Sequence, residues 1–263
     1  MIKFIASDMD GTLLDDDYSL HPRFFQLFEQ IQHHGIMFAA ASGRQYHSLI
    51  SFFEPIKDDM LFIAENGTLV MHKGEELYSC GLDFDTVLEV ICLARTMPGA
   101  HLVLNGKKQS YIETRDQVAE KTIRKFCFDC HWVDDLTKIK DDIVKVSVCH
   151  FNGVKEHLLP TFKQSFLNHQ VVVSGHIWLD VMNIKASKGE AIRFLQTHLD
   201  FSFEQTMSFG DNYNDIDMFK ASYHSYAVEN AELEIKQYAR FLAPANTDNG
   251  VIDTIQSYLN SLK

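Results

Sequence analysis

The sequence is short of positive charge. Its 24 Lys and Arg residues stand against 36 Asp and Glu, so the formal net charge is −12. Proteins that bind nucleic acid non-specifically or adhere to anionic membranes carry an excess of basic residues, and we expect neither partner here. No apolar run approaches membrane-spanning length, and the N-terminus lacks the basic and apolar regions of a signal peptide. These absences predict a soluble, cytoplasmic protein.

The sequence also lacks a disulfide pattern. It has five cysteines, an odd number, and most lie in apolar strand or helix patterns, as reduced thiols of a cytosolic protein do. We find no internal repeats and no low-complexity segment. A chain of 263 residues with 46% hydrophobic and 12% aromatic residues can bury a sizeable core, in one large or two medium domains.

The most informative stretch lies near the start of the chain. The apolar run Ile2–Ala6 predicts a buried strand, and two carboxylates, Asp8 and Asp10, follow it directly, with Gly11 next. Ligands of open α/β sheets bind at the carboxyl ends of the strands. Paired carboxylates there can hold a hard cation, or one can attack while the other transfers protons. The alternative is an Asp-rich turn with no chemical role.

The first third of the chain alternates between strands and helices. Apolar runs at 36–41 and 61–64 predict buried strands, and helical periodicity covers about 22–34 and 45–53. This alternation is typical of an α/β fold with a doubly wound parallel sheet. The pattern resumes near residue 184, with helices at 190–198, 216–221, 231–238 and from Val251, and strands at 206–209 and 225–228. We therefore predict a core domain made of residues 1–82 and 184–263.

The intervening residues 83–183 predict an inserted α+β domain. Residues 143–151 alternate between apolar and polar side chains, which is typical of a half-exposed strand in an antiparallel sheet covered on one face. The other expected elements are helices at 84–96, 116–128 and 154–167, and strands at 101–105, 109–113, 170–173 and 177–182.

Four polar clusters fall at strand ends or helix starts of the predicted core sheet. Each alone has an ordinary explanation as a turn, a loop or a solvated lysine, but their joint occurrence at one edge favours an active site. The clusters are Asp8/Asp10, Ser42-Gly43-Arg44, Lys188, and Asp211 with Asn214 and Asp215.

This set resembles the haloacid dehalogenase (HAD) superfamily of aspartate-nucleophile phosphatases. Its four motifs match Asp8–Thr12, Ala41–Arg44, Lys188 and Gly210–Asp215. The late insertion, Ser187-Lys188-Gly189, Glu65-Asn66-Gly67 and Asn249-Gly250-Val251 are similar to the Cof-type subgroup with a type IIB cap. The resemblance covers essentially the whole chain and implies a Rossmann-like core with an inserted cap domain.

The resemblance also implies catalytic roles. Asp8 would attack phosphorus and form an aspartyl-phosphate, and Asp10 would be the general acid and base. Mg²⁺ would bind the carboxylates of Asp8 and Asp211 and the backbone carbonyl of Asp10. Lys188 would neutralise charge on the phosphoryl oxygens.

Other motif residues would bind the phosphoryl group or support these side chains. Phosphate contacts are implied for Met9, Ser42, Gly43, Lys188 and Asn214. Thr12 would orient Asp10, and Asp215 would brace Lys188 or a water at the metal. For Arg44 and Asn66, a phosphate contact and a structural role carry equal weight.

The implied substrate is a small phosphate ester, foremost a sugar phosphate, and the inserted domain would select it. Its candidates for leaving-group contacts are Asn105, Lys107, Lys108, His176 and Trp178, although ordinary packing or surface roles are favoured for each. The alternatives are a phosphotransferase or phosphosugar mutase, and a non-catalytic phosphate-ligand sensor on the same fold. We expect a monomer or a weak homo-oligomer.

Overall fold

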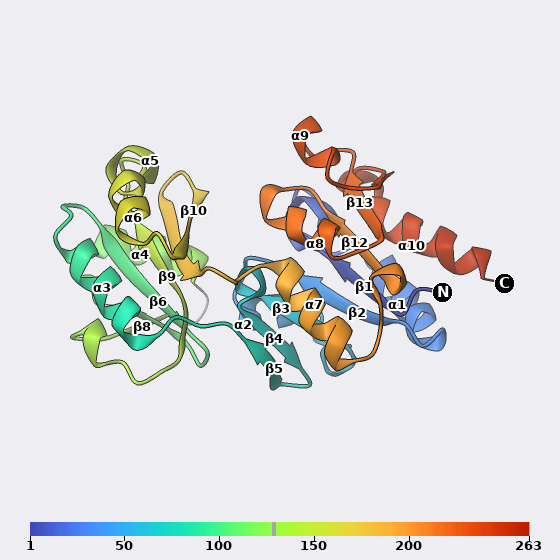
Figure 1. The fold of residues 1–263 in the computed structure, drawn as a ribbon, viewed down its shortest axis with the longest axis horizontal. Helices are drawn as coiled ribbons and strands as arrows, with labels where there is room; N and C mark the ends of the chain where they lie inside the picture. Colours follow the sequence, from blue (N-terminus) through green and yellow to red (C-terminus); the bar gives the residue numbers. More distant parts are fainter. Residues whose placement is uncertain (128–129, 263) are drawn as a thin grey trace. The chain divides into compact units, whose positions relative to one another are not determined.

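A computed structural model describes residues 1–127 and 130–262, which form two compact units. The core unit contains Met1–Tyr78 and the chain from Ser187 onward, and the inserted unit contains Ser79–Ala186 (Figure 1). The chain therefore passes from one unit to the other between residues 78 and 79 and again between residues 186 and 187. The sequence predicted these boundaries at 82/83 and 183/184. Within the described residues, no helix is both long and apolar enough to cross a membrane.

The core unit is built on one eight-stranded sheet with the order β14-β13-β12-β1-β2-β3-β4-β5. Its strands are β1 (Phe4–Ser7), β2 (Met37–Ala41), β3 (Leu61–Ala64), β4 (Leu69–His72), β5 (Glu75–Ser79), β12 (Thr206–Gly210), β13 (His224–Val228) and β14 (Phe241–Ala243). The strands from β14 to β3 pair in parallel. The α/β prediction is confirmed, with one difference: β4 is antiparallel to β3, because the short turn Glu65–Gly67 leaves no room for a crossover helix.

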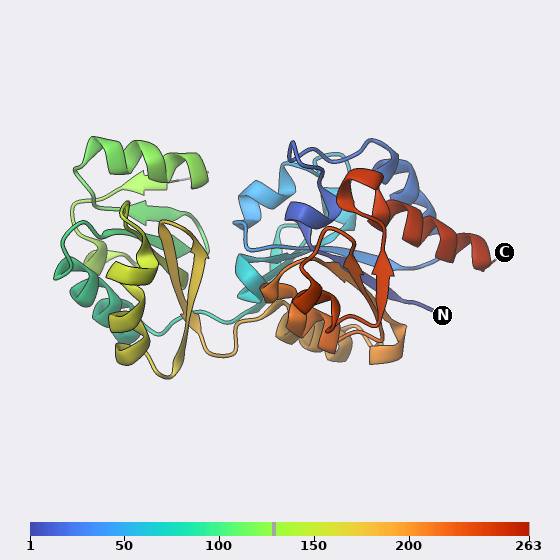
Figure 2. The ribbon, with the colours of Figure 1, turned by 90° about the horizontal axis from the view of Figure 1, so that it is seen from above.

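Helices cover both faces of the core sheet, which explains why the central strands β1, β2 and β3 are almost entirely apolar. On one face, α1 (Arg23–His33), α2 (Tyr46–Ile50) and α10 (Gly250–Ser261) pack in one apolar cluster. On the other face, α7 (Lys188–His198) and α8 (Ile216–Lys220) form a second cluster (Figure 2). The short helix α9 (Leu233–Lys236) contacts β13.

The inserted unit has a second sheet with the order β10-β11-β9-β6-β7-β8. Its elements are α3 (Phe84–Arg95), β6 (His101–Gly106), β7 (Ser110–Ile112), α4 (Gln117–Phe126), β8 (Cys130–Trp132), β9 (Ile143–Cys149), α5 (Val154–His157), α6 (Leu159–Ser165), β10 (His169–Gly175) and β11 (Trp178–Asn183). The α+β prediction is confirmed. The helix expected over 154–167 is two helices instead, since Pro160 has no N–H to continue the first. The helix predicted over 116–128 ends at Phe128, which lies outside the described residues. Strand β8 was not predicted.

The prediction that this sheet is covered on one face only was wrong. Helices α3 and α6 pack on one face, and α4 packs on the other (Figure 2), where Ile123 clusters with Val103 and Ile112. Strand β9 is consequently buried along its whole length. Its polar side chains are satisfied by neighbours: Ser147 donates to Asp180 at 2.6 Å and accepts from Asn105 at 3.0 Å. The alternation of apolar and polar residues in β9 therefore reflects a buried polar network, and not a side of the strand that faces solvent.

Candidate active site

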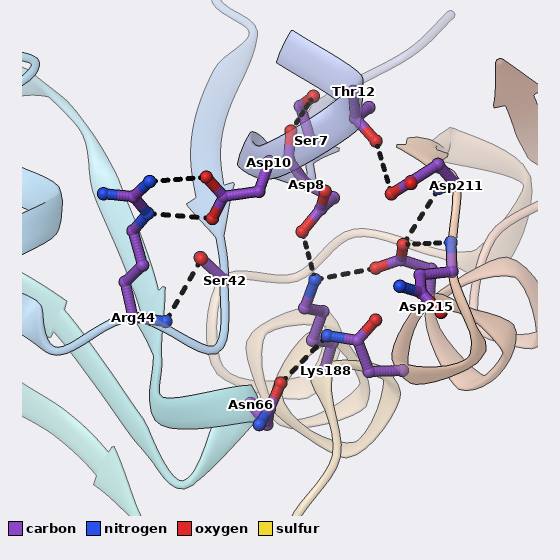
Figure 3. Close-up of polar contacts among 12 residues, drawn as sticks. Ser7, Asp8, Asp10, Thr12, Ser42, Arg44, Asn66, Lys188, Asp211 and Asp215 are labelled. Carbon is purple, nitrogen blue, oxygen red and sulfur yellow. Dashed lines mark hydrogen bonds and ion pairs between the residues drawn. The ribbon is translucent and has the colours of Figure 1, made fainter. Parts of the chain in front are cut away.

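The carboxyl ends of three adjacent core strands bring the predicted site residues together. Strands β12, β1 and β2 are neighbours in the sheet, and Asp211, Asp8 and Ser42 directly follow them. Figure 3 shows these side chains converging from separate elements on one region. The convergence follows from parallel pairing, because parallel neighbours place their carboxyl ends at the same edge.

A kinked turn follows Asp8. The segment Met9–Leu13 has a π-helical hydrogen-bond pattern but contains non-helical angles at Asp10 and Gly11. Gly11 has a φ of +78°, and a Cβ on it would lie 2.7 Å from Oδ2 of Asp211. Only glycine fits both the left-handed backbone and this close approach. The turn can therefore pass directly beside the Asp211 carboxylate.

Lys188 lies at the centre of the site, at the start of α7 and completely buried. The preceding residue, Ser187, caps the helix by accepting the backbone N–H of Glu190 at 3.0 Å. The Lys188 ammonium donates to Oδ1 of Asp8 at 2.5 Å and to Oδ1 of Asp215 at 2.7 Å (Figure 3). A buried charge is tolerated only when it is paired in this way.

Gly67 permits the backbone packing that positions Lys188. Its φ is +92°, and a Cβ on it would lie 2.2 Å from the carbonyl oxygen of Ser187 and 2.7 Å from the amide nitrogen of Lys188. The turn after β3 thus rests directly on the start of α7.

We expect Gly67→Ala to displace Lys188 and to lower both stability and activity. Gly74→Ala is the matched control, since Gly74 also has a positive φ, +77°, but nothing within 4 Å of the added Cβ. Both variants should carry the backbone cost of about 1 kcal/mol for a non-glycine residue at positive φ, and only the first should carry the clash. Urea unfolding and turnover are the measurements, and equal effects of the two variants would contradict this account.

Asp215 and Thr12 fix the position of Asp211 and of the turn after β12. Oδ2 of Asp215 accepts the backbone N–H groups of Asp211 and Asn212 at 3.0 and 3.1 Å, which fixes the turn after β12. Thr12, expected beside Asp10, donates instead to Oδ1 of Asp211 at 3.1 Å. The side chains of Asp211 and Asp215 thus have defined orientations before any ligand binds.

The cluster carries an excess of negative charge. A carboxylate oxygen from each of Asp8, Asp211 and Asp215 lies within 4.8 Å of the other two, and Lys188 is the cation that pairs with two of them. Burial raises the pKa of Asp8 well above its ordinary value, and Asp215 and Asp211 add to the rise against the opposing effect of Lys188. Burial, and then Asp215, raises the pKa of Asp211 to about 6.

The donor set fits a divalent cation. When all three are ionised, three carboxylates and one ammonium carry two net negative charges, and carboxylate oxygens are the ligands that Mg²⁺ takes in proteins. Burial lowers the pKa of Lys188, but Asp215 and Asp8 outweigh burial and raise it above its ordinary value, so the ammonium stays charged. A bound Mg²⁺ would offset the remaining charge.

Asp10 points away from this cluster and toward Arg44 (Figure 3). Nε of Arg44 donates to Oδ2 of Asp10 at 2.8 Å, and Nη2 donates to Oδ1 at 2.5 Å. The structure therefore gives Arg44 an ion-pair partner. Hydrogen bonding to Asp10 raises the pKa of Arg44 further.

The predicted phosphate-binding residues lie around the same edge. The side chain of Ser42 accepts the backbone N–H of Arg44 at 3.2 Å, and Asn214 donates to Asn66 at 3.0 Å. A Cβ on Gly43 would lie 3.0 Å from Oδ1 of Asn66, so the motif turn also packs closely. Met9 is buried in the turn after β1.

The candidates for leaving-group contact all lie in the inserted unit. Asn105 belongs to the buried polar network, Trp178 packs edge-on against Phe126, and Lys107 lies 3.4 Å from Asp142. The remaining two, Lys108 and His176, are exposed.

Sequence reasoning missed two asparagines that support the turn after Asp8. Asn230 donates to the carbonyl oxygen of Gly11 at 2.7 Å, and Asn246 donates to that of Leu14 at 3.0 Å. They are linked, since the backbone N–H of Asn246 donates to the side chain of Asn230 at 3.1 Å. Each follows a strand of the same sheet, β13 or β14, so the strand-end argument could have found them.

The chain is similar to known proteins over nearly its whole length. The chain is 30% identical over 267 residues to 5-amino-6-(5-phospho-D-ribitylamino)uracil phosphatase YbjI of Escherichia coli (strain K12), covering 98% of this chain and 96% of the relative. A solved structure from Eubacterium rectale superposes with a TM-score of 0.92 at 29% identity, over 98% of this chain and 99% of that one.

The fold also matches the HAD subclass IIB sugar phosphatase BT4131, with a TM-score of 0.79 at 18% identity over 97% and 98% of the two chains. The family model described as haloacid dehalogenase-like hydrolase matches residues 5–255. The predicted enzyme class, a phosphatase of this family, is confirmed by these findings. The chain therefore belongs to the haloacid dehalogenase-like hydrolases.

Proposed function

We propose that this protein is a Mg²⁺-dependent phosphatase that hydrolyses small phosphorylated metabolites through an aspartyl-phosphate on Asp8. The observation that carries the proposal is the buried contact of Lys188 with Asp8, beside a carboxylate cluster that fits a divalent cation. A carboxylate nucleophile needs positive charge around it before an anionic phosphate ester can approach. The buried ammonium and the cation would supply that charge.

The two half-reactions divide the work between Asp8 and Asp10. In the first, an oxygen of Asp8 bonds to phosphorus as the bond to the leaving oxygen breaks, and Asp10 gives its proton to that oxygen. In the second, water attacks phosphorus, Asp10 takes its proton, and the bond between Asp8 and phosphorus breaks to release phosphate. General acid–base help of this kind contributes about 10²–10⁴-fold.

The remaining motif residues would bind the phosphoryl group. Ser42 and the backbone N–H groups of Met9 and Gly43 would donate to its oxygens, with Asn214 nearby. Lys188 would balance the charge that develops in the transition state. Mg²⁺, held by the carboxylates of Asp8 and Asp211 and the backbone carbonyl of Asp10, would bring the two anionic reactants together.

The substrate class that we propose is phosphate esters of sugars and sugar alcohols. The named substrate of the Escherichia coli relative carries its phosphate on a ribityl chain, and a fold relative is named a sugar phosphatase. Phosphate release from a panel of sugar phosphates, ribityl phosphates, nucleotides and flavin mononucleotide, with and without Mg²⁺, tests the proposal. An isomerised sugar phosphate without free phosphate would point to a mutase instead.

Asp211→Asn should lower Mg²⁺-dependent turnover but raise the stability of the metal-free protein. We expect loss of Mg²⁺-stimulated turnover by at least about 10²-fold, because one of the cation's ligands loses its charge. The metal-free variant should be more stable than the wild type at pH 7 by about 1–2 kcal/mol, since burial and Asp215 disfavour the ionised form, as the pKa of about 6 against an ordinary 3.8 shows.

Thermal melts with and without Mg²⁺ provide a readout besides activity. Mg²⁺ should stabilise the wild type, because a ligand that binds only the folded state does so, and it should leave Asp211→Asn unchanged. Asp217→Asn is the control, since that carboxylate lies on the neighbouring helix and is half exposed. A variant that kept the full Mg²⁺ response would exclude Asp211 as a ligand.

A further inference from the structure

The contact between Asp10 and Arg44 is not explained by stability. The two side chains are 37% and 29% exposed, and ion pairs in contact with solvent contribute little to stability. Their geometry is nevertheless specific: two parallel hydrogen bonds join the guanidinium to both oxygens of the carboxylate. Bidentate pairs of this kind fix the direction of a carboxylate as well as attracting it.

The Arg44 side chain is itself held in place. Its guanidinium carbon lies 5.6 Å from the centre of the Tyr18 ring and 5.2 Å from that of Phe52, within the range of cation–π contacts. Its backbone is fixed on both sides, since its N–H donates to Ser42 at 3.2 Å and its carbonyl oxygen accepts from Glu65 at 3.0 Å. The guanidinium is thus presented to Asp10 from a rigid base.

The loop that carries Tyr18 is also ordered by its own side chains. Oδ1 of Asp15 accepts the backbone N–H groups of Asp17 and Ser19, at 3.0 and 2.8 Å. The backbone N–H of Tyr18 donates to the carbonyl oxygen of Asp15 at 3.0 Å, and Tyr18 takes a left-handed φ of +57°. Tyr18 as a whole is 62% exposed, so burial of apolar surface does not explain why the loop holds its ring over Arg44.

We propose that Arg44, held against the rings of Tyr18 and Phe52, is a positioning residue that acts on the reaction through Asp10. This inference rests on the proposed function, in which Asp10 transfers the proton. Asp10 lies in the turn after β1, immediately before the left-handed Gly11, and the only hydrogen-bond partner of its carboxylate among the described residues is Arg44. Without Arg44 the carboxyl group would sample other rotamers, and proton transfer to the leaving oxygen would be rarer.

The dependence of rate on the leaving group tests this. The ratio kcat/KM reports the steps up to departure of the leaving group. An alkyl phosphate, such as a sugar phosphate, needs a proton on its leaving oxygen, whereas p-nitrophenyl phosphate does not. We expect Arg44→Gln to lower kcat/KM for the alkyl ester by about 10²-fold and for the aryl ester by less than about 5-fold. Arg44→Lys, which keeps the charge but not the two parallel bonds, should fall between.

Two further variants complete the test. In Asp10→Asn/Arg44→Gln, kcat/KM for the alkyl ester should equal that of Asp10→Asn alone within about 3-fold, because residues that act through one group are not additive. Tyr18→Ala should reproduce part of the Arg44→Gln effect with the same preference for the alkyl ester.

Three outcomes would overturn the inference. Equal losses for both esters, additive with Asp10→Asn, would mean that Arg44 contacts the phosphoryl group itself. A gain in activity would mean that the ion pair inhibits. A lower melting temperature with unchanged kinetics would mean a structural role only. If the wild type released no phosphate from either ester, the proposed function would fail first, and this inference with it.

Discussion

Asp8→Asn should abolish Mg²⁺-dependent phosphate release while leaving the protein folded. The amide has no carboxylate oxygen to attack phosphorus, and we expect kcat to fall by at least about 10³-fold, as losses of a catalytic nucleophile do. The fold should survive because an asparagine oxygen can still accept from Lys188, which keeps its second bond to Asp215. The variant also removes one charge from a crowded carboxylate cluster.

The measurements are phosphate release and the melting temperature of the same preparation. Rapid quenching of the wild type during turnover should yield a phosphorylated chain that hydroxylamine cleaves, as it does acyl phosphates, and Asp8→Asn should yield none. Asp58→Asn, a change to an exposed carboxylate outside the site, provides the control for both assays. Full turnover by Asp8→Asn would eliminate Asp8 as the nucleophile and the aspartyl-phosphate with it.

Lys188→Met should have the largest effect on stability of any single change in the site. The Lys188 side chain is completely buried and pairs with two carboxylates, at 2.5 and 2.7 Å. Methionine preserves the length of the side chain but leaves Asp8 and Asp215 without their cation. Removing one partner of a buried ion pair costs about 3–5 kcal/mol, so we expect a loss of that size in urea unfolding, together with at least about 10²-fold in kcat.

A second substitution can show that uncompensated charge causes this loss. Lys188→Met/Asp215→Asn should recover part of the stability, because only one of the two carboxylates is then left without its cation. The double variant should recover none of the activity. Lys220→Met is the matched control, since Lys220 is 55% exposed and lies 3.4 Å from Asp217, and it should change stability by less than about 0.5 kcal/mol. Equal losses from Lys188→Met and Lys220→Met would show that the buried pairing carries no special weight.

The sequence allowed the sheet edge to be predicted because parallel strands follow a strict rule. Once buried strands were assigned before Asp8, Ser42 and Asp211, their carboxyl ends had to meet at one edge. The structure brings these residues together, with Lys188 among them. The same rule applied to β13 and β14 would also have indicated Asn230 and Asn246, which hold the turn after Asp8.

What could not be predicted depends on contacts between side chains far apart in sequence. The hydrogen-bond partner of Thr12 is Asp211, 199 residues away in the sequence. No local pattern indicates that Thr12 bonds to Asp211 and not to Asp10. The alternation in β9 has the same period whether its polar side faces water or, as with Ser147 and Asp180, a buried neighbour. The role of Gly67 likewise becomes visible only when Ser187 lies against it.

The insertion also fixes an order of events during synthesis. Residues 79–186 are contiguous, so the inserted unit is complete when the ribosome has made just over two-thirds of the chain. The core unit cannot close then, because β1 pairs with β12, whose residues 206–210 come much later. Until that point β1 keeps one unpaired edge, which is a hazard for aggregation. Asp8 therefore cannot contact Lys188 before residue 188 has been made, or approach Asp211 before residue 211 has been made, and a product truncated earlier carries Asp8 without either group.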